Sequence, residues 1–253
     1  MTRFFLTIEY DGTDFIGWQR QPSGISVQQC IEEAAQKITN KKITLYGAGR
    51  TDSGVHASGQ VAHIDLPDKF NSNRVMEALN ANLLNYRIKI VEVSVVKEDS
   101  HARFSALWRK YKYTILNRLA PPALSEGKVW HVRYPLDIES MKKAANYLIG
   151  THDFTSFRAS QCQSKSPVKT LSSLTIKEKN ENVIIIAKAK SFLHHQVRNI
   201  VGTLQLVGCG KWSSEETIVA LEKKNRTYAG PTAPAAGLIL TDVKYPKRVY
   251  LKN

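Results

Sequence analysis

Strands and helices alternate in a fixed order along the first hundred residues, and this order limits the folds open to the chain. An alternating apolar run over residues 3 to 9 predicts a strand. Ser26 begins a capping box with Gln29, which opens a helix with apolar side chains at helical spacing. The remaining predicted elements are two strands at 42 to 46 and 60 to 66, a helix at 73 to 83 and a strand at 87 to 96.

This succession of strand, helix, two strands, helix and strand is the split βαβ or ferredoxin-like order, an antiparallel sheet with helices on one face. The same patterns recur after a polar connector at 97 to 105. The second set comprises strands at 108 to 117 and 129 to 133, a helix at 138 to 149 capped by Asp137 and ended by Gly150, strands at 171 to 179 and 182 to 190, a helix at 192 to 207, a short helix opened by Ser213 with Glu216, and a strand at 237 to 243.

The sequence therefore predicts an α+β protein of two related ferredoxin-like halves, similar to RNA-recognition folds. We expect an N-terminal half at residues 1 to 105, which carries the glycine-rich loop described below, and a C-terminal half at residues 106 to 253. The two antiparallel sheets are expected to join into one platform with a central cleft.

Charge points to a polyanionic partner. The 253 residues include 36 Lys and Arg against 22 Asp and Glu, a formal net charge of +14. The excess is uneven, because residues 1 to 126 hold 16 basic and 13 acidic side chains whereas residues 127 to 253 hold 20 and 9. Nucleic acid is the leading partner class, and the C-terminal half is expected to supply most of the positive surface.

Cysteine usage and the N-terminus indicate a cytoplasmic protein. Cys30, Cys162 and Cys209 lie far apart with no CxxC pair, so neither a disulfide framework nor a structural zinc cluster is expected. No apolar stretch approaches the ~20 residues that a membrane span needs, and the N-terminal run meets Glu9 before a signal peptide could form. The composition is typical of soluble globular proteins.

A glycine-rich run from Gly47 to Gln60 lies between two predicted strands and contains four glycines together with Arg50 and Asp52. From pattern alone, a turn held by an Asp side chain explains the Arg-Thr-Asp triplet more readily than a catalytic site does. A dinucleotide-binding loop is excluded because Asp52 stands where the third glycine is needed and no helical pattern begins there.

The letters GRTDSGVHA followed by GQV in this run closely resemble the catalytic loop of the tRNA pseudouridine synthase A family. The resemblance implies isomerisation of a uridine within tRNA, in which the base is detached from the ribose at nitrogen, turned and reattached through carbon 5, without cofactor or metal. Similar blocks follow in the family's order: EYDGTDFIGWQRQ at 9 to 21, HARFSA at 101 to 106, RKYKY at 109 to 113, HDFTSFR at 152 to 158 and SFLHHQVRNIVG at 191 to 202.

The resemblance assigns three catalytic residues. Asp52 occupies the family's catalytic position, where a carboxylate could attack the sugar carbon, add to the uracil ring or remove a ribose proton. Arg198 is the cation that keeps Asp52 charged, although the pattern alone reads as an Arg on a helix surface. Tyr111 is the active-site tyrosine expected to stack on uracil, while core packing explains it equally well; Tyr113 on the same strand face is expected to pack in the core.

Five further residues are implied to contact substrate or RNA. Arg50 is expected to flip the nucleotide out or to hold a phosphate. Leu238 is expected to form an apolar floor, with core packing as the alternative. Asp153, Phe154 and Arg158 resemble a loop beside the cleft, with simple termination of the preceding helix as the alternative.

The histidines are not expected to bind metal or to act as bases. Adjacent residues on a helix diverge by about 100°, so His194 and His195 do not share a face, and no third ligand lies at a useful spacing. His56, His63 and His101 are expected to serve as hydrogen-bonding residues.

The resemblance therefore implies a homodimeric tRNA pseudouridine synthase that acts on the anticodon stem-loop, at tRNA positions 38 to 40. We expect such an enzyme to read shape and phosphate more than base sequence. One alternative is a non-catalytic RNA-binding protein with sheet platforms. Against it, binding alone needs no carboxylate facing RNA. The other is a glycoside-cleaving hydrolase, which would need a second carboxylate and would release the base.

Overall fold

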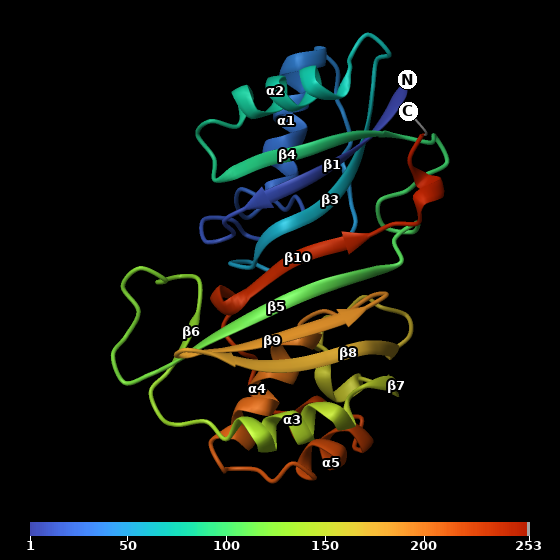
Figure 1. Ribbon diagram of the computed structural model, residues 1–253. Coiled ribbons are helices and arrows are strands. Elements are labelled where there is room, and N and C mark those ends of the chain that lie inside the picture. The colour runs from blue at the N-terminus through green and yellow to red at the C-terminus, as the bar shows by residue number, and fades with distance from the viewer. Residues whose placement is uncertain (252–253) are drawn as a thin grey trace. The chain divides into compact units, whose positions relative to one another are not determined.

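The structure, a computed structural model, describes residues 1–251 and divides into two compact units (Figure 1). Unit 1 contains Met1–Leu107 and the segment from Leu240 onward, and unit 2 contains Trp108–Ile239. This division differs from the predicted one because the chain's last segment returns to unit 1. There the backbone N–H of Leu107 donates to the carbonyl of Lys244 at 2.7 Å, so the final strand is held beside the connector that ends the first half.

Unit 1 is built on a sheet whose central strand is β1. β1 (Thr2–Tyr10) pairs antiparallel with both β3 (His56–Leu66) and β4 (Ile88–Val96), and the short β2 (Tyr46–Gly47) pairs with β3. Within this unit, the part of β10 (Leu238–Lys244) from Leu240 onward lies on the other side of β3 from β1. Phe4, Leu6, Ile8 and Tyr10 are buried on one face of β1, while Phe5 is the buried apolar residue on the other face.

Two helices complete unit 1. α1 (Val27–Thr39) and α2 (Ser72–Asn82) pack against each other, and α2 lies along β4. The Asn80 side chain joins α2 to β4, since its amide donates to the Ile90 carbonyl and its oxygen accepts from the Ile90 N–H, both at 2.9 Å. The order β1, α1, β2, β3, α2, β4 follows the sequence prediction.

The strand predicted at 42 to 46 is wrong over most of its length, because only Tyr46 is in a strand. Side chains of α1 take the backbone hydrogen bonds that a neighbouring strand would otherwise make. The Leu45 N–H donates to the Glu32 carboxylate at 3.0 Å, and the Gln28 amide donates to the Leu45 carbonyl at 3.0 Å. Ile43 and Leu45 are both buried, so the alternating apolar pattern here arises because these side chains pack in the core and not because the segment pairs with a strand.

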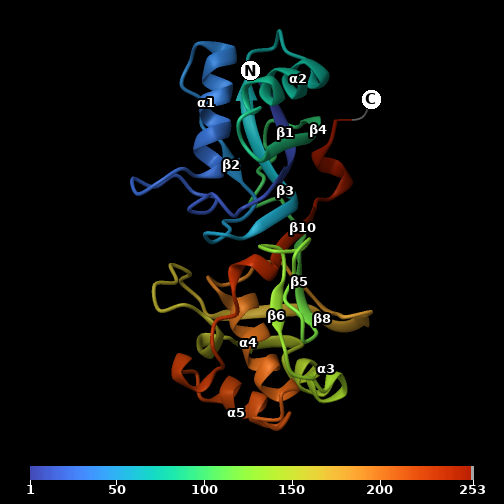
Figure 2. The same cartoon turned by 90° about the vertical axis from the view of Figure 1, so that its left-hand side faces the viewer.

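The elements of unit 2 are β5 (Trp108–Asn117), β6 (Trp130–Val132), α3 (Ile138–Tyr147), β7 (Gly150–Asp153), β8 (Val168–Lys179), β9 (Asn182–Ala189), α4 (Gln196–Gly208) and α5 (Glu216–Glu222). Its strands pair in the order β5-β9-β8-β7, and every pair in this series is antiparallel. The short strand β6 runs parallel to β5. Buried side chains of β5, β8 and β9 include Tyr113, Leu174 and Ile185, and α3 packs on β8 and on α4 (Figure 2).

Two predicted helix ends in unit 2 need correction. The helix expected at 138 to 149 ends at Tyr147, and the chain turns at Gly150, whose φ is +114°, into β7, which the sequence did not predict. The helix expected from residue 192 begins only at Gln196, since His195 has a left-handed φ of 62°. The Gln196 side chain instead accepts from the Leu193 N–H at 2.8 Å and closes the turn before the helix.

The overall class is confirmed as α+β with mainly antiparallel strands. The description of both halves as ferredoxin-like, the joined platform and the central cleft stay predictions. No helix within residues 1–251 is long and apolar enough to span a membrane. Short 3₁₀ turns lie at Thr155–Phe157, Arg226–Tyr228, Ala235–Gly237 and Lys247–Val249.

The capping box predicted for α1 forms only in part, and this yields a stability prediction. Ser26 accepts from the Gln29 N–H at 3.2 Å, but the Gln29 side chain donates to Glu33 instead of reaching back to Ser26. Ser26→Ala should therefore lower the free energy of unfolding by about 1 kcal/mol, whereas Gln29→Ala should change it by less than about 0.5 kcal/mol. Urea unfolding of the two variants measures this, and equal losses would show that the full box forms.

Candidate active site

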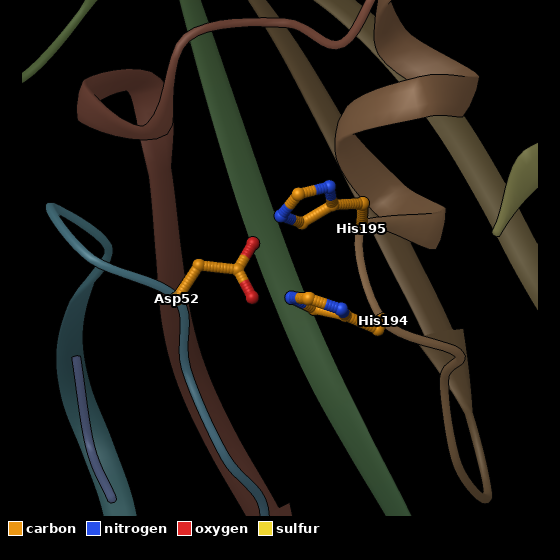
Figure 3. Close-up of side chains that lie close together, drawn as sticks. All are labelled: Asp52, His194 and His195. Atoms are coloured by element: carbon orange, nitrogen blue, oxygen red, sulfur yellow. The ribbon is translucent and has the colours of Figure 1, made fainter. Parts of the chain in front are cut away.

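Asp52 lies at the tip of the loop that joins β2 to β3, and its half-buried side chain projects from the loop backbone (Figure 3). The turn after it is tight, because the Val55 N–H donates to the Asp52 carbonyl at 3.1 Å while Gly54 adopts a φ of 75°. Only glycine reaches that conformation at no steric cost. Asp52 thus sits on a short turn with little conformational freedom.

A second segment of unit 1 holds this loop from one side. The Trp18 N–H donates to the Thr51 carbonyl at 3.0 Å, directly before Asp52. On the far side of Asp52, the Ser53 hydroxyl donates to the Phe15 carbonyl at 3.2 Å. The residue blocks 9 to 21 and 47 to 60, which are separate in sequence, therefore form one hydrogen-bonded structure around the carboxylate.

Two glycines permit this close approach. A Cβ at Gly17 would lie 2.6 Å from the Thr51 carbonyl oxygen, and Gly17 also has a φ of +114°. A Cβ at Gly12 would overlap the Val55 carbonyl. Both contacts are to backbone, which cannot swing aside as a flexible side chain can. Residues 9 to 21 therefore need glycine at these two positions, because any side chain there would collide with the backbone of the Asp52 loop.

Buried polar side chains complete the support of the loop. The Tyr10 and Thr51 hydroxyls are hydrogen-bonded at 2.8 Å, and the Gln60 amide donates to the Gly49 carbonyl at 2.9 Å. Burial raises the pKa of Tyr10 well above its ordinary value, so Tyr10 remains a neutral phenol. His56 Nδ1 accepts from the Gly12 N–H at 3.0 Å, as expected of a hydrogen-bonding histidine.

Unit 2 positions Tyr111 on β5, where it is almost fully buried and meets Phe192 edge to face at a ring separation of 5.2 Å. Tyr113 points to the same face and is completely buried, with its hydroxyl donating to the Pro234 carbonyl at 2.8 Å. Burial raises the pKa of Tyr113, while the nearby Arg198 opposes that rise. Tyr113 is therefore a core residue, as the sequence predicted.

Arg198 lies in the first turn of α4 and is half-buried. Its Nε donates to the Ala233 carbonyl at 2.8 Å, and the Ala233 N–H donates back to the Arg198 carbonyl at 3.1 Å. Because the side chain and backbone of Arg198 are both tied to one residue, the plane of the guanidinium is fixed.

Sequence reasoning missed the polar network that holds the Ala233 segment on α4. The Asn199 side-chain oxygen accepts from the Thr232 hydroxyl at 2.6 Å and from Arg226 at 3.2 Å. Asn199 in turn donates to the Phe157 carbonyl at 2.9 Å. The sequence signal for this network is that Asn199 and Thr203 stand among the apolar residues of α4, where buried polar groups must find partners.

Among the residues predicted to contact RNA, Phe154 requires correction. It is completely buried and packs edge to face on Phe157 at 6.0 Å, so its ring belongs to the core of unit 2. Asp153 accepts from the Thr155 N–H at 2.9 Å. Although burial alone would raise the pKa of Asp153, hydrogen bonds from Thr155 and the charges of Lys224 and Arg158 hold it below its ordinary value.

The remaining residues predicted to contact substrate or RNA differ in how far their side chains are exposed. Arg50 is exposed on the same loop as Asp52, and Arg158 is half-buried next to Ala159, whose N–H donates to the His194 carbonyl at 2.9 Å. Leu238 is buried at the start of β10. His194 and His195 precede α4 with ring centres 4.1 Å apart (Figure 3).

His63 and His101 are hydrogen-bond acceptors, as predicted. His63 Nδ1 accepts from the Ala102 N–H at 3.2 Å, and His101 Nδ1 accepts from the Arg103 N–H at 3.0 Å. Burial, followed by the nearby His101 and Arg3, lowers the pKa of His63 to about 4. Burial and two arginines also lower the pKa of His101. Both rings are therefore neutral near pH 7, as an accepting Nδ1 requires.

Comparison with known proteins gives one consistent result. The family model described as tRNA pseudouridine synthase matches residues 6–105 and 144–246. The chain is 54% identical over 245 residues to tRNA pseudouridine synthase A of Rhodospirillum centenum, covering 97% of this chain and 100% of that protein. It is 53% identical over 245 residues to the protein of the same name from Paramagnetospirillum magneticum, covering 97% and 96% of the two chains.

The close approach at Gly17 predicts a specific loss of stability. Gly17→Ala should lower the free energy of unfolding by more than Gly210→Ala, since both positions have positive φ but nothing lies within 4 Å of a Cβ at Gly210. Positive φ alone costs about 1–3 kcal/mol, and the overlap with the Thr51 carbonyl adds to it. Urea unfolding gives both values, and equal losses would contradict the close approach.

His63 predicts a dependence of stability on pH. An unfolded His63 binds a proton near its ordinary pKa of 6.5, whereas the folded protein holds it neutral down to about pH 4. Between these values the unfolded state binds more protons, so His63 makes the free energy of unfolding fall as pH falls, by at most about 1.4 kcal/mol per pH unit. His63→Asn, which keeps an acceptor, should show a shallower decline between pH 6.5 and 4.5; identical slopes would refute the assignment.

Proposed function

The chain belongs to the tRNA pseudouridine synthase family, and we propose that it isomerises uridine at positions 38 to 40 of the tRNA anticodon stem-loop with Asp52 as the catalytic carboxylate. The observation that carries this proposal is the rigid loop that presents Asp52. A loop that is held by hydrogen bonds on both sides of its carboxylate suits a reaction that needs a preorganised nucleophile or base.

The reaction sets the demands on these residues. The bond between ribose C1′ and uracil N1 breaks, and a bond between C1′ and C5 forms. The hydrogen at C5 leaves as a proton to solvent and N1 gains a proton, so the product is an isomer and nothing is oxidised or reduced. Asp52 would act as the nucleophile at the sugar or the base, or as the acceptor of a ribose proton.

Two residues of unit 2 are proposed to act with Asp52, on the strength of the family resemblance. Arg198 would keep Asp52 ionised, and the fixed plane of its guanidinium suits a two-pronged interaction with a carboxylate. Tyr111 would stack on the target uracil, since it is held edge to face by Phe192. Leu238 would form the apolar floor beneath the base.

Positive charge supports tRNA as the substrate. The net charge of +14 favours phosphate contacts, for which we propose Arg50 and Arg158. Asp153 is also a proposed RNA contact, and hydrogen bonds from the Thr155 N–H and hydroxyl hold its carboxylate in place.

We further propose that the protein acts in the cytoplasm and forms a homodimer. A second protomer would double the basic area available to one L-shaped tRNA.

One assay tests the activity together with the role of Asp52. With tRNA that carries tritium at uracil C5, the wild-type protein should release tritium to water without free uracil. Asp52→Asn should lower the single-turnover rate by at least about a hundredfold while tRNA affinity changes only a few-fold, because phosphate contacts dominate affinity.

The other readings of the chain predict different products. Free uracil would indicate a glycoside-cleaving hydrolase, and binding without any tritium release would indicate a non-catalytic RNA-binding protein. If the wild-type protein is active and Asp52→Asn retains more than a tenth of its rate, Asp52 is not the catalytic carboxylate. Ser58→Ala is the matched control, because Ser58 is exposed on β3 just after the loop and its replacement leaves both the carboxylate and the supports of the loop in place.

A further inference from the structure

A group of aromatic rings reaches the surface of unit 1 beside the strand that leads into the Asp52 loop. Tyr46 stacks on His63 with ring centres 4.9 Å apart and planes within 14°. His101 meets His63 at 4.5 Å, and Phe104 meets His101 at 4.4 Å. The rings therefore form a continuous series from the sheet to the exterior. We call Tyr46, His101 and Phe104 the aromatic platform.

The outer end of this platform is exposed to an extent that folding does not explain. Phe104 is 72% exposed and Tyr46 is 49% exposed. Exposed apolar residues are common singly, but two exposed rings joined through a histidine present a larger apolar surface. The Arg103 guanidinium lies 5.6 Å from the centre of the Phe104 ring, so the same surface carries a cation.

The turn that carries Phe104 is rigid. The Ser105 N–H donates to the His101 carbonyl at 2.9 Å, and the His101 N–H donates to the Ser105 hydroxyl at 3.0 Å. Between them Ala102 is completely buried, with its N–H donating to His63 and its carbonyl accepting from Tyr245 at 2.6 Å. Because hydrogen bonds fix the backbone on both sides of Phe104, the turn holds the Phe104 ring at the surface.

The platform and the catalytic loop are joined by a single strand. Tyr46 and Gly47 form β2 and pair with His63 and Ala62, and the Ala48 N–H continues this ladder to the Val61 carbonyl at 2.7 Å. The Asp52 loop begins directly afterwards. The platform therefore lies at the start of the short strand whose continuation carries Asp52, within the same unit.

We propose that the aromatic platform stacks on an unpaired base of the RNA near the target uridine, with Phe104 as the principal contact. Flat, rigid and exposed rings beside an arginine match the chemistry that holds unstacked bases, and stacking on a π-face tolerates any base. Such a site suits an enzyme that must accept different neighbouring bases. This inference rests on the proposed function, since it assigns the platform to the same RNA substrate.

The test measures binding in the Asp52→Asn background, where no product forms. Phe104→Ala should weaken binding of an anticodon stem-loop RNA about tenfold, which corresponds to about 1.4 kcal/mol and lies within the range of base stacking. Phe104→Trp should restore the affinity. Leu84→Ala is the matched control, because Leu84 is 75% exposed in the same unit and should have no effect. The slope of affinity against salt should not change with Phe104→Ala.

A second measurement separates stacking from a structural role. Stem-loop RNAs that lack one base at each unpaired position in turn are bound to both proteins, and at one position Phe104→Ala should cause no further loss. Unchanged affinity of Phe104→Ala for the intact RNA would overturn the proposal, as would an equal loss with every abasic RNA. Dissociation of a dimer by Phe104→Ala in sedimentation would overturn it in favour of a contact between protomers. None of these outcomes depends on tritium release, which tests the activity itself.

Discussion

The hydrogen bond from the Trp18 N–H to the Thr51 carbonyl is the interaction on which the geometry of the Asp52 loop depends. It joins a segment near the N-terminus to the residue before the carboxylate, and it forms only because Gly17 lets the two backbones approach. A hydrogen bond between backbone groups is modest in net free energy, but each buried group left without a partner costs more. The loop therefore has one low-energy arrangement, and Asp52 is presented from a fixed position.

Unit 2 uses the same device at Arg198. Gly202 on α4 lies where a Cβ would overlap the Pro231 carbonyl, so the segment that reaches Ala233 can run against the helix. Ala233 then binds both the side chain and the backbone of Arg198. In each unit, a glycine lets a second backbone segment come close enough to form hydrogen bonds that orient a charged residue or the loop that carries it. An apolar core stabilises each unit, while these close backbone approaches set the orientation of the residues proposed to act on uridine.

The sequence predicted most elements because their apolar patterns were regular and their caps were local; β5 and the N-cap of α3 at Asp137 are examples. It failed where tertiary contacts replaced local ones. Leu45 looked like a strand residue, but Glu32 takes its N–H. Phe154 stood in a motif that suggested RNA contact, but it packs on Phe157. The resemblance to a known family identified Asp52, whereas the hydrogen-bond partners of Asn199 and the exposure of Phe104 became clear only from the structure.

The most direct test of the account is amide hydrogen exchange at Trp18 and Val55, whose N–H groups bind the carbonyls of Thr51 and Asp52. If the Asp52 loop is fixed as described, both amides exchange as slowly as those of Leu6 and Ala62 in the sheet of unit 1, because exposing them requires that the unit open. Fast exchange at Trp18 and Val55, with slow exchange retained at Leu6 and Ala62, would show that the loop moves independently and would contradict the claim that Asp52 is held in place before RNA binds.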